Sequence, residues 1–449
     1  MDEVALKAEW YSHCDPDTTP VSGRQSRPAW YVPLDAWPDP ETRQVVPLRG
    51  SLGLDALYRH IVLSSQAGDR MSAQLFAGFR GTGKSTELAR LAERLRETKK
   101  FAVLEIRADA WFHMGAAPTA YELGLVLVGA MADLAEVQLN LDVFKKKSGW
   151  ARIETFLGEI QGTEATLKLG LADLKFAFRA TGGEFRAQLA SLLGDKPEKL
   201  RAFVHGAVLE LATKLPPEQQ LVVLVDGLEK FQVGPEQIAT VYRQVTDLFQ
   251  QQHLLLRLPR CHVVYTVPPY LEAVNVRVGE YYGGRVRMLP SVRVHGRQPE
   301  RAPYAPGIRA LLTMVGHRVD LERMFGACWQ DCTRALILAS GGHVRDLLML
   351  VRETVLAGFD VPLPLGMSQV EQAIAVWRTG PGGHPWPPGM LQLLHQIDQD
   401  QRLTQMPDGD LSAFAQAMDQ FLVLAYRNGE TWYDVHPLVR HRLSGPSAT

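Results

Sequence analysis

Residues 78–86, GFRGTGKST, constrain the fold of this 449-residue chain more than any other segment. They match the pattern G-x-x-x-x-G-K-[ST] at every fixed position, from Gly78 to Ser85. An apolar run of strand length (71–79) leads into the loop, and residues 85–100 follow it with leucines at helical spacing. Strand, glycine loop and helix in this order direct the positive end of a helix dipole towards an anion. The segment therefore predicts a phosphate-binding loop in an α/β domain.

The residue types in the loop suit a nucleotide and a magnesium ion. Glycines let successive backbone N–H groups turn inward around the β- and γ-phosphates. Lys84 brings a positive charge to those phosphates, and Ser85 offers a hydroxyl to Mg²⁺. The predicted nucleotide-binding residues of the loop are Gly78, Arg80, Gly81, Thr82, Gly83, Lys84, Ser85 and Thr86.

A second segment, LVVLVDGLEKF (221–231), predicts the metal-binding half of the same site. Residues 221–225 form an uninterrupted apolar run, as in a strand buried on both faces. Asp226 ends that run, at the edge where ligands bind in open parallel sheets. We expect its carboxylate to hold Mg²⁺ directly or through water. The alternative is a buried strand followed by an ordinary turn acid.

The composition excludes some classes of function. Lys and Arg number 48 against 49 Asp and Glu, a net charge of −1, so no global field attracts nucleic acid or a membrane. The acidic start MDEVALKAEW is no secretory signal, and the longest apolar run (123–132) is too short to span a bilayer. We expect a cytoplasmic protein with no membrane contact. The four cysteines fit a reducing compartment, and Cys328 and Cys332 lack the spacing of a zinc site.

The order of apolar segments predicts a three-layer α/β domain over residues 46–300, preceded by an irregular arm at 1–45. Its five strands are expected within 71–79, 100–109, 221–226, 261–271 and 286–294. An insertion at about 110–215 is expected to hold helices at 118–140, 144–160 and 184–212 and a hairpin at 166–180. Thr266 ends the fourth strand, where it would sense the γ-phosphate, position water, or serve as an ordinary strand-end hydroxyl.

Two further domains are predicted after the α/β domain. Residues 301–380 read as a helical lid, in which a Gly-Gly break precedes a helix that begins near Arg345. Residues 386–449 contain helices followed by a hairpin around Asn428-Gly429. Helices followed by a hairpin are the outline of a winged helix.

Five segments in order, GFRGTGKST, LVVLVDGLEKF, Thr266, SGGHVRDLL and DVHPLVR, resemble a STAND-class signalling ATPase, over about residues 46–445. This class is related to the AAA+ and origin-recognition ATPases, and the NACHT branch is the most similar. Asp226-Gly227-Leu228-Glu229 is similar to the D-G-hydrophobic-[DE] motif of that branch, whereas most AAA+ motors place Glu directly after the Asp. The resemblance implies a P-loop (ASCE-type) sheet domain with a helical lid and a winged helix, and with Walker A and Walker B motifs.

The resemblance also implies roles for four residues outside the loop. Glu229 would orient or deprotonate the attacking water, but slowly, because Lys230 replaces the usual second acid. Arg345 would reach the γ-phosphate from the lid, and His436 would contact the ADP β-phosphate and hold an inactive state closed. Alternatively, Arg345 is an ordinary surface residue of its helix, and His436 is a histidine that only packs against the wing. The predicted catalytic residues are Lys84, Asp226, Glu229 and Thr266, and the predicted metal ligands are Ser85 and Asp226.

Three functions remain open. The preferred one is an ATP- and ADP-binding switch that hydrolyses slowly and acts with an effector or sensor protein in trans, by resemblance in a bacterial defence or regulatory system. Homo-oligomerisation on ATP binding fits this function. The second is an origin-recognition-like ATPase acting on DNA, which is disfavoured because residues 403–426 contain no Lys or Arg and include Asp408, Asp410 and Asp419. The third is a nucleotide-dependent scaffold with little turnover.

Overall fold

The structure is a computed structural model, and it describes most of the chain. The described residues are 2–18, 27–50, 53–68, 71–141, 148–161, 171–179, 183–231, 238–274, 277–379, 386, 389–402 and 411–444. They form two compact units, one of residues 1–54, 78–89 and 288–449 and one of residues 55–77 and 90–287. Two of the acidic residues named in the sequence analysis, Asp408 and Asp410, lie outside the described residues.

A five-stranded sheet has the strand order β4-β5-β6-β3-β7. The strands are β3 (Ala73–Gly78), β4 (Phe101–Arg107), β5 (Gln220–Asp226), β6 (Cys261–Val267) and β7 (Arg287–Leu289). The pairs β4–β5, β5–β6 and β3–β6 are parallel, with Val225 opposite Tyr265 and Phe76 opposite Thr266. Because these strands run the same way, the chain leaves β3, β5 and β6 at one edge of the sheet. The predicted parallel α/β fold is confirmed, although the last strand has three residues where nine were expected.

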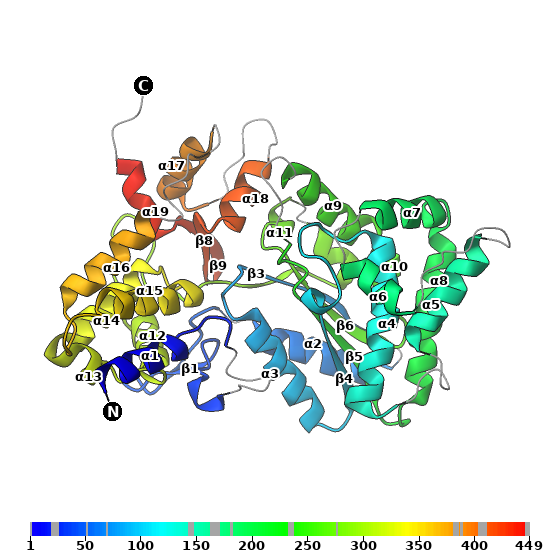
Figure 1. The fold of residues 1–449 in the computed structure, drawn as a ribbon, viewed down its shortest axis with the longest axis horizontal. Coiled ribbons are helices and arrows are strands. Elements are labelled where there is room, and N and C mark those ends of the chain that lie inside the picture. The colour runs from blue at the N-terminus through cyan, green and yellow to red at the C-terminus, as the bar shows by residue number, and fades with distance from the viewer. Residues whose placement is uncertain are drawn as a thin grey trace. The chain divides into compact units, whose positions relative to one another are not determined.

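The unit of residues 55–77 and 90–287 covers its part of the sheet with helices. They are α2 (Leu54–Gln66), α4 (Ala120–Leu139), α5 (Gly149–Gln161), α6 (Leu171–Arg179), α7 (Gly183–Leu193), α8 (Pro197–Lys214), α9 (Ile238–Gln251), α10 (His253–Leu256) and α11 (Leu271–Val274), with 3-10 turns at Ala108–Ala110 and Val278–Tyr282. Helix α4 starts at a capping box between Thr119 and Glu122. It contacts β4, α5, α7 and α8, so it is the centre of the helical layer (Figure 1).

The described part of the predicted insertion contains helices, turns and loops but no strand, and residues 171–179 are helical, so the expected hairpin at 166–180 is wrong. Residues 171–179 form α6, because Leu174 and Phe178 are four residues apart, share a helix face and are 1% and 2% exposed. The alternation of polar and apolar residues had indicated strands. The expected helix at 184–212 is two helices, α7 and α8, separated by residues 194–196.

The other unit contains the chain's N-terminal segment, the phosphate loop and the C-terminal third. Its elements are α1 (Glu3–His13), β1 (Trp37–Pro38), β2 (Val45–Val46), the start of α3 (Lys84–Glu97), α12 (Ala305–Gly316), α13 (Leu321–Phe325), α14 (Trp329–Ala339), α15 (Val344–Ala357), α16 (Met367–Thr379), α17 (Met390–Asp400), α18 (Leu411–Asp419), β8 (Val423–Asn428), β9 (Glu430–Val435) and α19 (Pro437–Arg440), with 3-10 turns at Pro28–Trp30, Gly326–Cys328 and His441–Ser444. The predicted helical character of residues 305–378 is confirmed.

The sequence had indicated an irregular N-terminal arm at residues 1–45. The arm instead begins with a regular helix, α1. Leu6 and Trp10 are four residues apart, and both belong to the hydrophobic core that α12–α16 build. Nζ of Lys7 donates hydrogen bonds to the carbonyl oxygens of Phe359 (3.1 Å) and Val361 (2.6 Å), just after α15. The arm is therefore an integral part of this unit.

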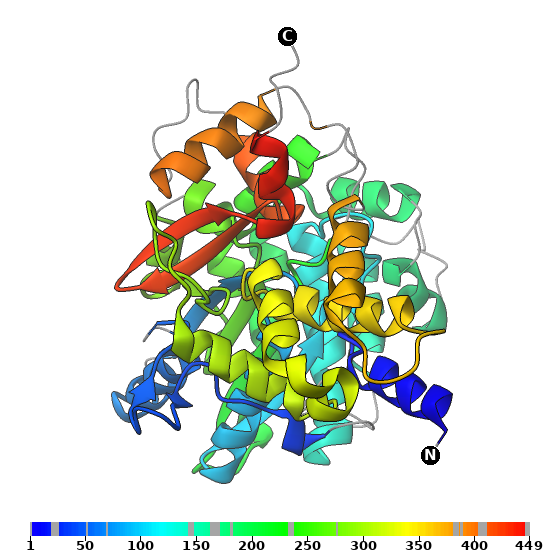
Figure 2. The same cartoon turned by 90° about the vertical axis from the view of Figure 1, so that its left-hand side faces the viewer.

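The C-terminal hairpin around Asn428-Gly429 is confirmed, with Gly429 at φ 96° in the turn. Strands β8 and β9 lie beside α17, α18 and α19 (Figure 2), and α17 contacts β9. Buried Asp434 accepts hydrogen bonds from Arg301 and is 2.7 Å from Nη2 of Arg440, and both arginines also bond Asp398. This network of two carboxylates and two guanidiniums fixes the hairpin to α17 and to the segment before α12.

No helix in the described ranges is long and apolar enough to cross a membrane. All four cysteines are free thiols, with Sγ of Cys332 at 3.4 Å from Sγ of Cys328.

Candidate phosphate-binding site

The phosphate loop has the backbone of an anion-binding nest. Gly81 and Gly83 have φ angles of 89° and 94°, which glycine adopts without strain. Helix α3 starts at Lys84, and the N–H groups of its first turn have no intrahelical acceptor. Nζ of Lys84 donates to the carbonyl oxygens of Gly78 and Phe79, both at 2.7 Å, and the side chain is buried. The loop thus combines inward-turning amides with a buried ammonium.

A buried arginine that the sequence analysis missed supports the loop. Nη2 of Arg49 donates to the carbonyl oxygen of Thr82 (2.7 Å), and Nη1 lies 3.8 Å from the carboxylate of Glu87 in α3. Tyr31 donates to the same carboxylate at 3.3–3.4 Å. Arg49 belongs to no recognisable sequence motif, so its role beside the phosphate loop could not be predicted. Its position adds a second positive charge to the phosphate loop.

The N-terminus of α15 abuts the phosphate loop. The backbone N–H of Arg345 donates to the carbonyl oxygen of Gly81 (3.1 Å), and Nε2 of His343 lies 2.8 Å from the carbonyl oxygen of Arg80. A Cβ atom on Gly81 would lie 2.4 Å from Cβ of Arg345. Any displacement of the loop backbone therefore alters its contacts with the first residues of α15.

We expect Gly81→Ala to lower the free energy of unfolding by about 3 kcal/mol, because the new methyl group adds overpacking of about 1–3 kcal/mol to left-handed strain of about 1–2 kcal/mol. The matched control is Gly389→Ala, at φ 82° with no atom within 4 Å of the new Cβ, which should lose about 1 kcal/mol. Denaturant titration of both variants measures the difference. Equal losses would contradict the tight contact between the loop and α15.

A buried carboxylate joins α15 to the end of the C-terminal hairpin. Oδ2 of Asp346 is 2.9 Å from Nδ1 of His343 and 3.0 Å from Nε2 of His436. The backbone N–H of Leu438 donates to Nδ1 of His436, so the ring's Nε2 carries the proton that Asp346 accepts. Burial alone raises the pKa of Asp346, but the charge of His343 and the hydrogen bonds from both histidines outweigh it and hold this pKa well below its usual value. We call these three side chains, His343, Asp346 and His436, the latch.

His436 was predicted to contact a phosphate, and in this structure both of its ring nitrogens face protein groups. The side chain is 2% exposed. Its connection to the phosphate loop runs through Asp346 and then His343, which itself reaches Arg80. Sequence reasoning missed His343 and Asp346 because their partners are distant in the chain. His343 meets Arg80 across 263 residues, and Asp346 meets His436 across 90.

Arg345, the predicted γ-phosphate sensor, pairs with the N-terminal arm. Its Nη1 lies 3.0 Å from Oδ1 of Asp17, and its side chain is 28% exposed. Two turns further along α15, Arg352 lies 3.5 Å from Asp15. Two acids of the N-terminal arm therefore form ion pairs with two arginines of α15.

In the unit of residues 55–77 and 90–287, Asp226 stands at the carboxyl end of β5. Oγ1 of Thr266 accepts hydrogen bonds from the N–H groups of Gly227 (2.8 Å) and Leu228 (3.2 Å), and Thr266 is fully buried. Gly227 has φ 95°, which the turn requires. Thr266 therefore fixes the turn after Asp226, in which Glu229 also lies. Nζ of Lys230 is 3.7 Å from Oδ2 of Asp226.

Asp226 and Ser85, the two predicted magnesium ligands, belong to different compact units, and each is described within its own unit. Mg²⁺ is typically held by one or two protein oxygens together with substrate phosphates and water. The side chain of Asp226 is 12% exposed, and Ser85 is half-buried in the loop. Within the described ranges no group of three His, Cys, Asp or Glu side chains could hold a metal ion without such help.

No protein-family model matches the sequence, and no curated protein matches it. Solved structures with a similar fold include the ORC1 protein of Aeropyrum pernix in complex with DNA (13% identity, 87% of this chain and 92% of that chain, TM-score 0.36). Cdc6p from Pyrobaculum aerophilum is similar at 10% identity, with 87% and 93% covered and a TM-score of 0.35. Drosophila ORC bound to DNA is similar at 12% identity, with 99% and 92% covered and a TM-score of 0.36.

Proposed function

We propose that this protein is an ATP-binding switch whose phosphate loop controls the position of its C-terminal hairpin. The observation that carries the proposal is the unbroken chain of contacts Arg80 carbonyl–His343–Asp346–His436. It joins a loop built for phosphates to the last residue before α19. Because each link is buried, a shift of the loop has to be accommodated along the whole chain of contacts.

The phosphate loop and α15 supply the nucleotide contacts. Lys84 turns from the carbonyls of Gly78 and Phe79 to the β- and γ-phosphates, and Arg345 exchanges Asp17 for the γ-phosphate. These movements bias the latch between a closed and an open state, according to whether two or three phosphates are bound.

Hydrolysis in this proposal is slow. Asp226 and Ser85 help to hold Mg²⁺, which supplies charge neutralisation at the phosphates when bound, and Glu229 orients water. Lys230 lies beside Asp226 and competes for its carboxylate. Thr266 acts by holding the turn that carries Asp226 and Glu229, rather than by direct chemistry.

The signalling role follows the STAND and NACHT resemblance of the motifs. In that role the helices α17 and α18 with the hairpin act as a winged helix that closes on the lid, α12–α16. Opening on ATP binding would recruit an effector or sensor in trans or a second copy of the chain.

An origin-recognition-like role on DNA is the second candidate, and one observation favours it. A hollow of about 420 Å³ near the hairpin is lined by two arginines, three glutamines and one acid, which are Arg297, Gln298, Gln399, Asp400, Gln401 and Arg402. Both arginines lie within 4.0 Å of Glu430 of β9. Guanidinium and amide groups are typical contacts to DNA phosphates and base edges.

Turnover of ATP with and without duplex DNA separates the candidates. The switch predicts tight ATP and ADP binding, slow turnover and no effect of DNA. Turnover stimulated by DNA would favour the origin-recognition-like role, and binding with no turnover at all would favour a scaffold. No affinity for ATP or ADP would refute all three.

Asp17→Asn should tighten ATP binding by up to about fivefold, because the exposed pair with Arg345 contributes about 0.2–1 kcal/mol that the γ-phosphate no longer has to displace. ADP affinity should stay unchanged, since ADP lacks that phosphate. Calorimetric titration with both nucleotides measures the ratio. Asp15→Asn, which removes the partner of Arg352, is the matched control and should alter neither affinity. An equal change for ATP and ADP would refute the sensor role of Arg345.

A further inference from the structure

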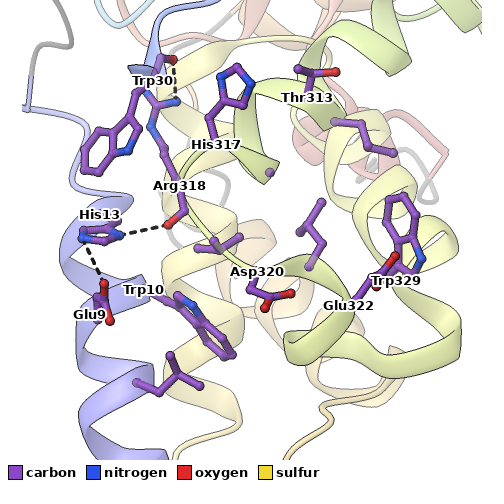
Figure 3. Close-up of a pocket in the computed structure, with 15 residues that line it drawn as sticks. Glu9, Trp10, His13, Trp30, Thr313, His317, Arg318, Asp320, Glu322 and Trp329 are labelled. Atoms are coloured by element: carbon purple, nitrogen blue, oxygen red, sulfur yellow. Dashed lines mark hydrogen bonds and ion pairs between the residues drawn. The ribbon is translucent and has the colours of Figure 1, made fainter. Parts of the chain in front are cut away.

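A groove away from the phosphate loop lies between α1, the Pro28–Trp30 turn and helices α12–α14. Its volume is about 660 Å³, within the range of about 300–1,000 Å³ typical of ligand sites (Figure 3). Every element that lines it belongs to the same compact unit. Neither the proposed nucleotide site nor the latch uses any of its side chains.

The walls of the groove combine apolar and polar surface and are rich in tryptophan. Indole rings come from Trp10 of α1, from Trp30 and from Trp329 of α14. Leucine side chains, such as Leu6 and Leu312, lie between them. Indole faces attract cations as well as apolar groups, so these walls suit a ligand that has both an apolar stem and a positive charge.

The exposed charges of the groove are carboxylates. Glu9, Asp320 and Glu322 come from α1, from the cap of α13 and from α13 itself, and all three are exposed. In Figure 3 the carboxylates of Asp320 and Glu322 line the groove between the indoles of Trp10 and Trp329. Three acids on different elements therefore face one aromatic hollow.

The guanidinium among the described lining residues does not balance these acids. Arg318 is 7% exposed, and its Nη1 donates to the carbonyl oxygens of Trp30 (3.3 Å) and Met314 (2.9 Å). Its guanidinium also lies over the ring of Trp30, 5.3 Å from the centroid. Because Arg318 is already held by the protein, the charges left to face a ligand are the three carboxylates, of which Glu9 lies 3.7 Å from Nε2 of His13, beside the imidazoles of His13 and His317.

Helix α1 already binds an arginine of this chain in the same manner. Arg352 lies 4.0 Å from the ring centroid of Tyr11 and 3.5 Å from the carboxylate of Asp15. An aromatic face of α1 beside a carboxylate that follows the helix thus holds a guanidinium group in this chain. The groove offers a similar pair of groups in Trp329 and Glu322.

We propose that this groove binds an arginine-bearing, basic segment of a partner protein. Arginine side chains lay their apolar stems along the partly exposed indole of Trp329 and place their guanidinium groups on the carboxylates of Glu9, Asp320 and Glu322. The carboxylates of the groove select basic over acidic segments.

The test uses the full-length chain and the peptide acetyl-Arg-Arg-Arg-amide, titrated by calorimetry and by tryptophan fluorescence. The triple variant Glu9→Gln, Asp320→Asn, Glu322→Gln removes the charge but keeps the shape. Asparagine at 320 still accepts the capping hydrogen bond from the N–H of Arg323. The matched control is Glu371→Gln, an exposed acid on α16 that does not line the groove.

We expect the peptide to bind the native chain and Glu371→Gln equally and the triple variant about tenfold more weakly, with Trp329→Ala also weakened. Acetyl-Glu-Glu-Glu-amide should not bind. Equal binding to the triple variant, binding of the acidic peptide, or no binding of the basic peptide to the native chain would overturn the proposal. Binding of tetraethylammonium without any binding of the basic peptide would also overturn it, because the groove would then serve a small cation.

Discussion

Lys84→Ala abolishes ATP binding, with an expected loss of affinity of about 100-fold or more. The ammonium is buried in the loop and can donate to several acceptors at once, and each charge-assisted hydrogen bond contributes about 1.5–3 kcal/mol. Calorimetric titration with ATP measures the effect. Lys100→Ala, an exposed lysine just after α3, is the matched control and should bind ATP normally.

Thermal unfolding of Lys84→Ala must accompany this titration, since Nζ also bonds two carbonyl oxygens of the loop. A folded variant with unchanged ATP affinity would show that the loop is not the nucleotide site. In that case the switch, the DNA-acting ATPase and the scaffold would all lose their basis.

Asp346→Asn lowers the free energy of unfolding by about 3 kcal/mol or more at neutral pH, because removing one partner of a buried ionic network costs about 3–5 kcal/mol. Both His343 and His436 lose the carboxylate that they share. Urea titration of the native chain and the variant measures the difference. The matched control is Asp360→Asn, an exposed acid after α15, which should change stability by less than about 0.5 kcal/mol.

The effect of Asp346 also has a defined pH dependence. The folded protein holds the pKa of Asp346 well below its usual value, so the carboxylate stabilises the fold fully above the unfolded pKa of about 4. This stabilisation is lost as the pH falls below about 4 towards the depressed folded value. The gap between the native chain and Asp346→Asn should therefore narrow from pH 7 to pH 3. A constant gap would mean that Asp346 does not act through its charge.

The sequence predicts the elements that local patterns determine. The loop at 78–86 depends on glycine spacing, and the strands at β3 and β5 on unbroken apolar runs, so both are visible in a single chain. The hairpin at Asn428-Gly429 depends on a two-residue turn signal. By contrast, α6 was missed because its alternating pattern fits a strand as well as a helix.

The rest of the candidate site depends on contacts between distant segments. Arg49 reaches Thr82 across 33 residues, and Asp346 reaches His436 across 90. Nothing in the residues around Arg49 or Asp346 indicates these partners, since lone charged residues have many structural roles. The motifs therefore identify where a phosphate would bind, whereas only the fold reveals how that place is connected to the hairpin.

The most direct test of the proposed coupling is the rate at which a fluorescent ADP analogue leaves the native chain and the His436→Ala variant. If the latch couples the hairpin to the phosphate loop, the variant should release the nucleotide about fivefold faster or more, the lower end of coupling energies of about 1–3 kcal/mol. His441→Ala, an exposed histidine five residues later, should release it at the native rate. Identical release rates in all three proteins would contradict the account.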